Sequence, residues 1–175
     1  MAKDRVFDAT LVIDPREALL QQGYLWTVTE LFDVPRDGDA LITWEVGSGQ
    51  LATIDLRVLS TQELIGDVVT ITSISNEGLV LPALNRNFAF APTASAPSTK
   101  FRLNPTVETS TGSGSPRILA SANVDREFAA VIMPGGVHLG IRWQNQSQAF
   151  DAKVHAIAVW HEEPQHKFPA GDPGP

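Results

Sequence analysis

The chain has 175 residues and a mass of 18.9 kDa, which fits one domain that can bury a core without covalent cross-links. It contains no Cys, which excludes disulfides, thiolate zinc sites, iron–sulfur clusters and Cys nucleophiles. Thirteen Lys and Arg against twenty Asp and Glu give a net charge of −7. Nucleic acid is therefore not an expected partner, because that affinity rests mainly on cations placed against phosphates.

The sequence shows no targeting segment and no membrane span. Its first residues, MAKDR, lead into a mixed stretch and not into the apolar run of a signal peptide. No stretch approaches the roughly 18 consecutive apolar residues that a membrane helix needs. We therefore expect a protein that is made and assembled in a bacterial cytoplasm, without a membrane partner. Asn145-Gln146-Ser147 matches a glycosylation sequon, which we interpret as coincidence in a chain without a secretion signal.

In chain order, residues 15–22 (PREALLQQ) could form one short helix, with Pro15 at its first position and Gly23 just beyond its end. After this segment the pattern is mostly that of strands. Gly66-Asp67 is expected to precede the strand at 68–74. The nearly continuous apolar run 156–160 suggests a strand covered on both faces. Runs rich in β-branched and aromatic residues between Gly, Pro and Asn turns predict strands at 24–33, 40–46, 51–59, 68–74, 79–81, 101–103, 128–133, 137–143 and 154–161.

The middle of the chain has a different composition. Residues 91–100 (APTASAPSTK) and 109–116 (TSTGSGSP) are rich in Ala, Pro, Thr, Ser and Gly. Such composition cannot bury much apolar surface. We therefore predict two long loops within 85–117, on either side of the short strand at 101–103, and long loops in a compact domain are usually functional or mobile.

Eight or more short strands with regular turns predict an all-β fold, an antiparallel β-sandwich. A jelly-roll topology is expected, because two sheets with long crossing connections accommodate the two predicted loops. We divide the chain into an extended N-terminal arm at 1–23, a β-sandwich domain at 24–163 and a Pro- and Gly-rich tail at 164–175.

The sequence holds none of the common catalytic motifs. There is no nucleophile elbow, no metalloprotease motif and no phosphate-binding loop. His155 and His161 would share one face of the last strand but lie about 20 Å apart, too far to hold one metal ion. Most acidic residues lie in predicted turns, where capping explains them. We expect no enzyme activity, no catalytic residues, no metal and no cofactor.

The four Trp residues could serve either of two purposes. Trp26, Trp44, Trp143 and Trp160 all fall within predicted strands, so we expect at least three of them in the core or in a subunit interface. The alternative is an exposed aromatic platform that stacks on sugar rings.

A third hypothesis for the function, a small cupin-like metalloenzyme, needs two His and a carboxylate to converge inside the scaffold.

The two ends of the chain suggest contacts with neighbouring subunits. Residues 1–14 (MAKDRVFDATLVID) alternate in polarity but are too short to fold alone, and 162–175 (EEPQHKFPAGDPGP) are polar and rich in Pro. We expect one or both ends to lie along other subunits, because a polyproline-like strap has little conformational entropy to lose. The alternative is that the ends pack against their own sheet.

An ordered set of short motifs resembles small β-rich virion proteins of tailed bacteriophages, of the capsid decoration (cement) type. The resemblance covers roughly 24–163. It departs from the family pattern at Trp160-His161-Glu162, where a Trp-Tyr-Glu ending is expected, and before Arg142, where a Tyr is expected. The motifs are TVTELFDV (27–34), ALIT (40–43), NRN (85–87), NPTV (104–107), VIMPGG (131–136), IRWQN (141–145) and AIAVWHE (156–162).

The resemblance implies a non-enzymatic subunit, a homotrimer on the surface of the virion capsid, with the major capsid protein as its partner. A carbohydrate-binding or adaptor module of a phage neck or tail fibre is the alternative. The loop at 85–87 is expected either to make an interface contact or to brace an internal turn. The candidate interface residues are Val6, Phe7, Leu11, Ile13, Asn85, Arg86, Asn87 and Phe168.

Overall fold

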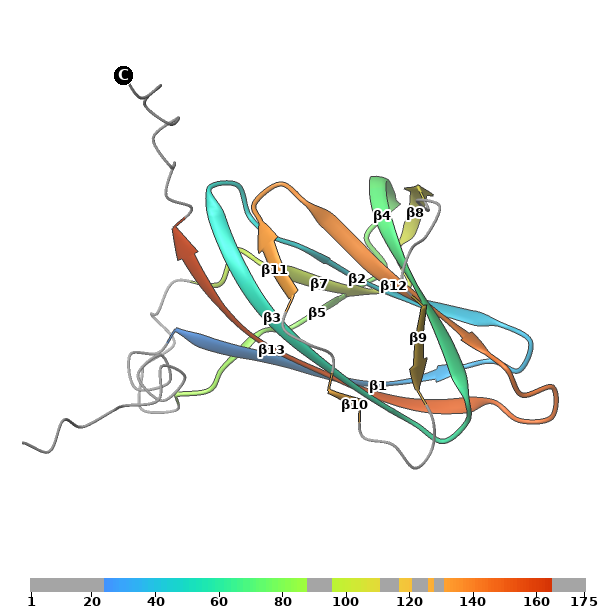
Figure 1. Cartoon of the computed structure of the whole chain (residues 1–175). Helices are drawn as coiled ribbons and strands as arrows, with labels where there is room; N and C mark the ends of the chain where they lie inside the picture. The colour runs from blue at the N-terminus through green and yellow to red at the C-terminus, as the bar shows by residue number, and fades with distance from the viewer. Residues whose placement is uncertain (1–23, 88–95, 111–116, 121–125, 128–130, 165–175) are drawn as a thin grey trace, which may run out of the picture.

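The computed structural model describes residues 24–87, 96–110, 117–120, 126–127 and 131–164. These residues form strands and no helix, so the all-β prediction is confirmed (Figure 1). The short helix considered for 15–22 lies outside them. The strands are β1 (Leu25–Val34), β2 (Asp39–Glu45), β3 (Gln50–Ser60), β4 (Leu64–Asn76), β5 (Leu79–Leu81), β6 (Leu84–Asn85), β7 (Lys100–Leu103), β8 (Thr106–Ser110), β9 (Arg117–Ala120), β10 (Arg126–Glu127), β11 (Val131–Pro134), β12 (His138–Asn145) and β13 (Ala152–Pro164).

The strands form two antiparallel sheets that pack face to face as a sandwich (Figure 1). Sheet A has the order β10-β3-β13-β1-β6, with β11 also paired to β3. Sheet B has the order β5-β7-β2-β12-β4-β8, with β9 also paired to β4. The first and last long strands lie side by side in sheet A, where Trp26 is paired with Trp160.

The core lies between the two sheets and follows the two-residue period of each strand. On β13, Ala156, Ala158 and Trp160 point inward and are buried. The ring of Phe101 lies between those of Trp44 and Trp160, with centroid distances of 6.3 Å and 4.9 Å. Trp44 also donates its indole N–H to the sulfur of Met133 at 2.6 Å.

The prediction for the Trp residues is confirmed. Trp44, Trp143 and Trp160 are buried in the core, and the half-buried Trp26 packs against the same cluster. Burial of large rings in the space between the sheets is the expected use of such side chains in a sandwich. The four rings therefore do not form an exposed sugar-stacking platform, and the lectin-like reading loses the observation on which it was based.

The structure differs from the sequence predictions for strands at three places. Residues 106–110 were expected in a loop, but they form β8 and pair with β4, as the β-branched pair Thr106-Val107 allows. Residues 117–120 also pair with β4, as β9, beyond the end of the second predicted loop. Gly66-Asp67 does not precede a strand, because β4 already begins at Leu64.

Sheet B curls on its outer side, where a second small cluster forms. The pairing of β4 with β8 shifts register at two places, and such bulges bend a strand and increase its twist. Leu41, Val69 and Ile71 are buried there, and Ile74 and Val107 pack against them. The outer face of sheet B is therefore partly covered by its own edge strands, whereas the outer face of sheet A carries a groove.

Candidate interaction groove

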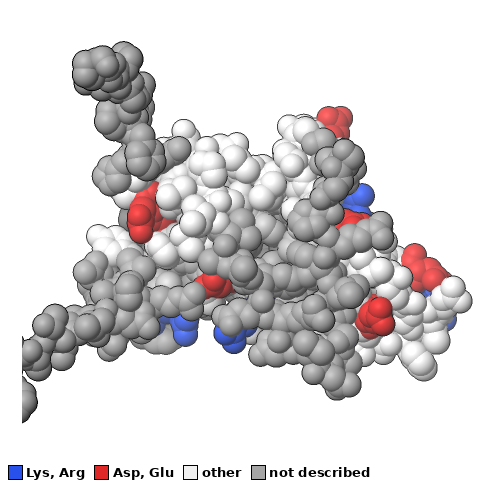
Figure 2. Space-filling view, in the orientation of Figure 1, with Lys and Arg blue, Asp and Glu red and all other residues white. Residues whose placement is uncertain are grey.

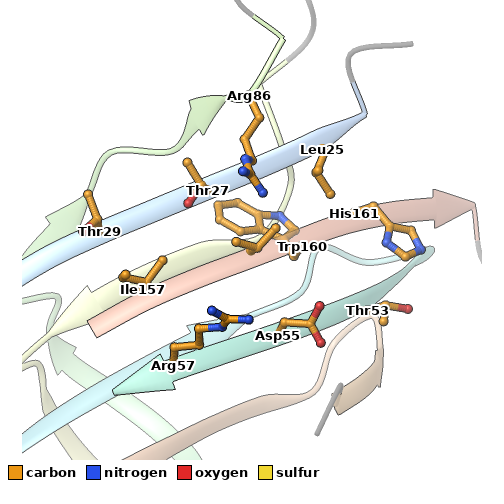
Figure 3. A pocket seen from close by; sticks show the side chains of 11 residues that line it. Leu25, Thr27, Thr29, Thr53, Asp55, Arg57, Arg86, Ile157, Trp160 and His161 are labelled. Carbon is orange, nitrogen blue, oxygen red and sulfur yellow. The ribbon is translucent and has the colours of Figure 1, made fainter. Parts of the chain in front are cut away.

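The groove lies on the outer face of sheet A, across β1, β13 and β3, and has a volume of about 550 Å³ (Figure 3). Its floor comes from β13, one wall from β1 with the segment after β6, and the other from β3. The described residues that line it are Leu25, Thr27, Thr29, Thr53, Asp55, Arg57, Arg86, Ile157, Val159, Trp160 and His161.

The strand register explains why these side chains meet. Antiparallel pairing places Thr27 beside Val159, and Val159 beside Asp55. One step along the sheet, Thr29 lies beside Ile157, and Ile157 beside Arg57. Directly opposed side chains in such a ladder lie on the same face of the sheet. The floor is therefore apolar, and the walls carry hydroxyl and charged groups.

The central strand carries apolar side chains on both faces. Ala156, Ala158 and Trp160 face the core, while Ile157 and Val159 are half-buried on the groove side. Only one face of this strand is covered by the opposite sheet. The sequence-based expectation that residues 156–160 are covered on both faces is therefore met on the core side, whereas on the groove side Ile157 and Val159 are only half-buried.

Charged groups stand on both walls of the groove. Figure 3 shows the guanidinium of Arg57, from β3, and that of Arg86, from the segment after β6, on opposite sides of Ile157 and Trp160. Asp55 lies two residues from Arg57 on the same face of β3, and His161 stands at the end of the floor. Among the described lining residues there are thus two permanent cations and one carboxylate.

The Asn85-Arg86-Asn87 element is held by hydrogen bonds and also reaches the groove. The Asn87 backbone N–H donates to the Asn85 side-chain carbonyl at 2.8 Å, which is an Asx turn. The Arg86 N–H donates to the carbonyl oxygen of Leu25 at 3.0 Å, while the Arg86 side chain is exposed. Both readings offered for this element, a turn brace and a contact loop, are compatible with that geometry.

Further apolar side chains extend the outer face beyond the groove. The register places Leu31 and Leu59 on either side of His155, one step past Ile157, and Leu31 is 72% exposed. Ile132 on β11 is paired with Thr53 and is 65% exposed. Exposed apolar side chains gathered on one face are typical of interaction surfaces.

Glu162 fixes the loop before β7 to the end of β13, a role that the sequence did not reveal. Its carboxylate accepts hydrogen bonds from the backbone N–H groups of Ser98 and Thr99 at 2.9 and 2.6 Å, and from the Ser98 hydroxyl at 2.8 Å. The Trp160 indole N–H adds a fourth at 3.3 Å. Burial opposes ionisation, but the hydrogen bonds from Thr99 and Ser98 outweigh it and lower the pKa of Glu162 below its usual value.

A second polar cluster lies under the curled side of sheet B. The buried Arg102 donates to Glu45 at 3.1 Å and to Glu77 at 3.3 Å, and both carboxylates reach solvent. His138 is paired with Glu45 across the sheet. Burial lowers the pKa of the His138 imidazole; Glu45 opposes this effect and Arg102 adds to it. The cluster joins three strands and the turn before β5, which is a structural role.

Asn145, the sequon residue, is buried and fully engaged. Its amide nitrogen donates to the carbonyl oxygens of Val34 and Phe150 at 3.1 and 2.9 Å, and its side-chain oxygen accepts from the Ser147 N–H at 2.9 Å. An amide nitrogen in this position cannot carry a glycan without breaking the loop. The interpretation of the sequon as coincidence is supported on structural grounds.

The remaining predicted residues divide into two groups. His155 and His161 share the outer face of β13, as expected, and no cluster of three metal-binding side chains occurs among the residues the structure describes. The arm and tail residues of the interface prediction, Val6, Phe7, Leu11, Ile13 and Phe168, lie outside the described residues. The groove residues Asp55 and Arg57 were missed, although the alternation in LATIDLRVL places both on the polar face of β3.

Figure 2 shows acidic side chains scattered over the described part of one face, with fewer basic ones between them. Within the described ranges, no helix is long and apolar enough to cross a membrane. No protein-family model matches the chain, and no curated protein matches it.

Proposed function

We propose that the protein is a non-enzymatic structural subunit of a bacteriophage virion, of the capsid decoration type. In this proposal it is a homotrimer with a jelly-roll fold that binds the major capsid protein on the capsid surface. It is assembled in the cytoplasm of the host and stabilises the head shell against the pressure of packed DNA. It needs no cofactor, because its contribution is contact area.

The strand order supports the jelly-roll part of the proposal. Sheet A contains β10 or β11, β3, β13 and β1 in this order, and sheet B contains β2, β12, β4 and β8. The chain changes sheet at every step from β1 to β4 and again at both steps from β11 to β13. With the short strands β5, β6, β7 and β9 set aside, this alternation between two four-stranded layers is the arrangement expected of a jelly roll.

Two of the resemblance motifs lie together at one end of sheet A. Asn85 and Trp160 are both paired with Trp26, near the start of β1. The Asn-Arg-Asn element and the closing Trp-His-Glu segment, far apart in the sequence, therefore meet at one end of sheet A. That end is also where the N-terminal arm joins the domain.

The single observation that carries the proposal is the open outer face of sheet A. Its central strand presents Ile157 and Val159 in a groove, and Leu31, Leu59 and Ile132 are exposed around it. A specific protein interface needs about 800 Å² from each partner, and a broad sheet face can supply it. A closed trimer contacts several capsomers at once, so that weak contacts add through avidity.

The proposal is tested on heads of a phage whose gene for this chain has been deleted, so that the heads lack the protein. Purified protein added to such heads is expected to co-sediment with them, to saturate at a multiple of three copies per binding position and to raise the temperature at which DNA is released. Recovery with tails or fibres alone, or absence of binding to heads, would contradict the proposal. Binding to heads with no effect on DNA release would contradict the stabilising role.

A further inference from the structure

We propose that the groove of one subunit binds residues 6–14, within the N-terminal arm, of a second copy of this chain. The inference rests on the proposed function and deepens it, because it names the contact that would link subunits into a trimer. The partner is a segment of known sequence, and the groove is built from described residues. Three properties of the groove and of the arm sequence carry the argument.

The first property is position. Leu25, the first residue of β1, lines the groove, and residues 1–23 precede it directly. Twenty-three extended residues reach roughly 75 Å, which is enough to cross to the same groove on a neighbouring subunit.

The second property is the apolar pattern. The outer face of β13 from His155 to His161 is about 20 Å long, and its part from Ile157 to His161 forms the floor of the groove. In the arm, every second residue from Phe7 to Ile13 is apolar, as an extended segment with one apolar face requires. This stretch has the same length as the outer face of β13 between the two His residues, so its apolar side chains fit against Ile157 and Val159 and extend beyond the groove.

The third property is charge. The arm residues 6–14 (VFDATLVID) contain two carboxylates, Asp8 and Asp14, and no cation. The groove walls carry the guanidinium groups of Arg57 and Arg86 against the one carboxylate of Asp55. Opposite charges across an interface fix its register and speed association. The same stretch would be repelled by the acidic surface elsewhere on this chain, whose net charge is −7.

A cysteine pair tests the contact directly, because the natural chain has no Cys. In the full-length chain, L11C together with V159C is expected to give disulfide-linked dimers and trimers on a non-reducing gel. L11C with V80C is the matched control, since Val80 is an exposed aliphatic residue on β5 of the other sheet. A linkage confined to single chains, or no linkage above the control, would overturn the proposal.

A mixing experiment separates exchange between copies from packing within one copy. The groove variant Ile157→Lys and the arm variant F7D/L11D are each expected to be monomeric, with association weakened at least tenfold, while their circular dichroism stays that of a folded sheet protein. Mixed together, they should form a one-to-one complex, because one variant keeps its arm and the other keeps its groove. No mixed complex, or an F7D/L11D chain that still forms trimers, would refute arm exchange.

The same variants distinguish failure of this inference from failure of the proposed function. If Ile157→Lys and F7D/L11D chains associate like the unaltered protein while the unaltered protein still binds heads, arm exchange is refuted and the decoration role stands. If the L11C/V159C chain links between copies but the unaltered protein binds no heads, arm exchange stands and the decoration role is refuted. Val80→Lys is the control substitution and should leave both readouts unchanged.

Discussion

At the scale of single residues, the polar side chains of the described structure mostly serve to join strands that are distant in sequence. Glu162 holds the loop before β7 at the end of β13 through four donors. Asn145 ties the start of the loop after β12 to the end of β1. Asn104, with a φ of 50°, accepts a hydrogen bond from the Leu41 N–H at 2.9 Å. Each of these contacts needs one particular side chain, so each can be tested by a single substitution.

Glu162→Gln is expected to lower the free energy of unfolding at pH 7 by about 1–3 kcal/mol, because an amide offers one acceptor oxygen where the carboxylate offers two. The folded-state pKa of Glu162 is lowered, so its contribution is present above the ordinary carboxyl pKa and is lost as the pH falls through the folded value. Urea unfolding at pH 7 and at about pH 3 should show the difference between variant and parent shrinking in acid. Glu163→Gln, at an exposed neighbour, should change neither value, and equal effects of the two substitutions would refute the role of Glu162.

For Arg102 we predict a substitution that does not destabilise the protein. Its guanidinium is buried, yet Nε and Nη1 have no hydrogen-bond partner in the structure among the residues it describes. Arg102→Met keeps most of the apolar volume and removes this desolvated charge, so we expect the free energy of unfolding to change by less than about 1 kcal/mol or to rise. Arg102→Ala, which leaves a cavity, should be destabilising by about 2 kcal/mol or more. A large loss in the Met variant, measured by urea unfolding, would show that the ion pairs with Glu45 and Glu77 are net stabilising.

At the scale of strands, a two-residue period decides which side chains enter the core. This period also places Gly66 on the inward face of its strand. Gly66 on β4 is paired with Trp143 on β12, and both face inward. A Cβ atom at position 66 would stand 2.7 Å from the Trp143 ring and 2.8 Å from a methyl group of Ile141. The glycine therefore makes room for a fully buried indole, which is why it lies inside a strand and not in a turn.

Gly66→Ala is accordingly expected to destabilise the protein by about 1–3 kcal/mol through overpacking. Thr70→Ala on the exposed part of the same strand is the control and should stay within about 0.5 kcal/mol. Thermal unfolding of the two variants beside the parent would measure this. An unchanged melting temperature in Gly66→Ala would mean that the Trp143 ring can shift at no cost.

At the scale of the whole molecule, the two ends of the domain complete one sheet. β13 is the central strand of sheet A and lies between β1, at the start of the domain, and β3. Sheet A cannot form until nearly the whole domain is available. Such pairing between distant segments predicts slow folding, on the order of milliseconds to seconds.

Removal of residues 152–175 is therefore expected to abolish cooperative unfolding, because it deletes β13, leaves β1 and β3 without their shared partner strand and removes Trp160 from the core. Removal of residues 165–175 leaves every described strand in place and should retain a cooperative transition. Circular dichroism during urea unfolding distinguishes the two. A cooperative transition in the chain that lacks residues 152–175 would contradict the central position of β13.

The sequence by itself determined the all-β class, most of the strands and the burial of three Trp rings, because these follow from local alternation and from turn residues. It did not determine the strand at 106–110, which depends on pairing with β4, nor the place of Gly66 inside β4, which depends on a Trp 77 positions away in the chain. The groove was decided only by the tertiary structure. Arg57, Arg86 and Ile157 come from three separate segments, and only the register of β1, β13 and β3 brings them to one face.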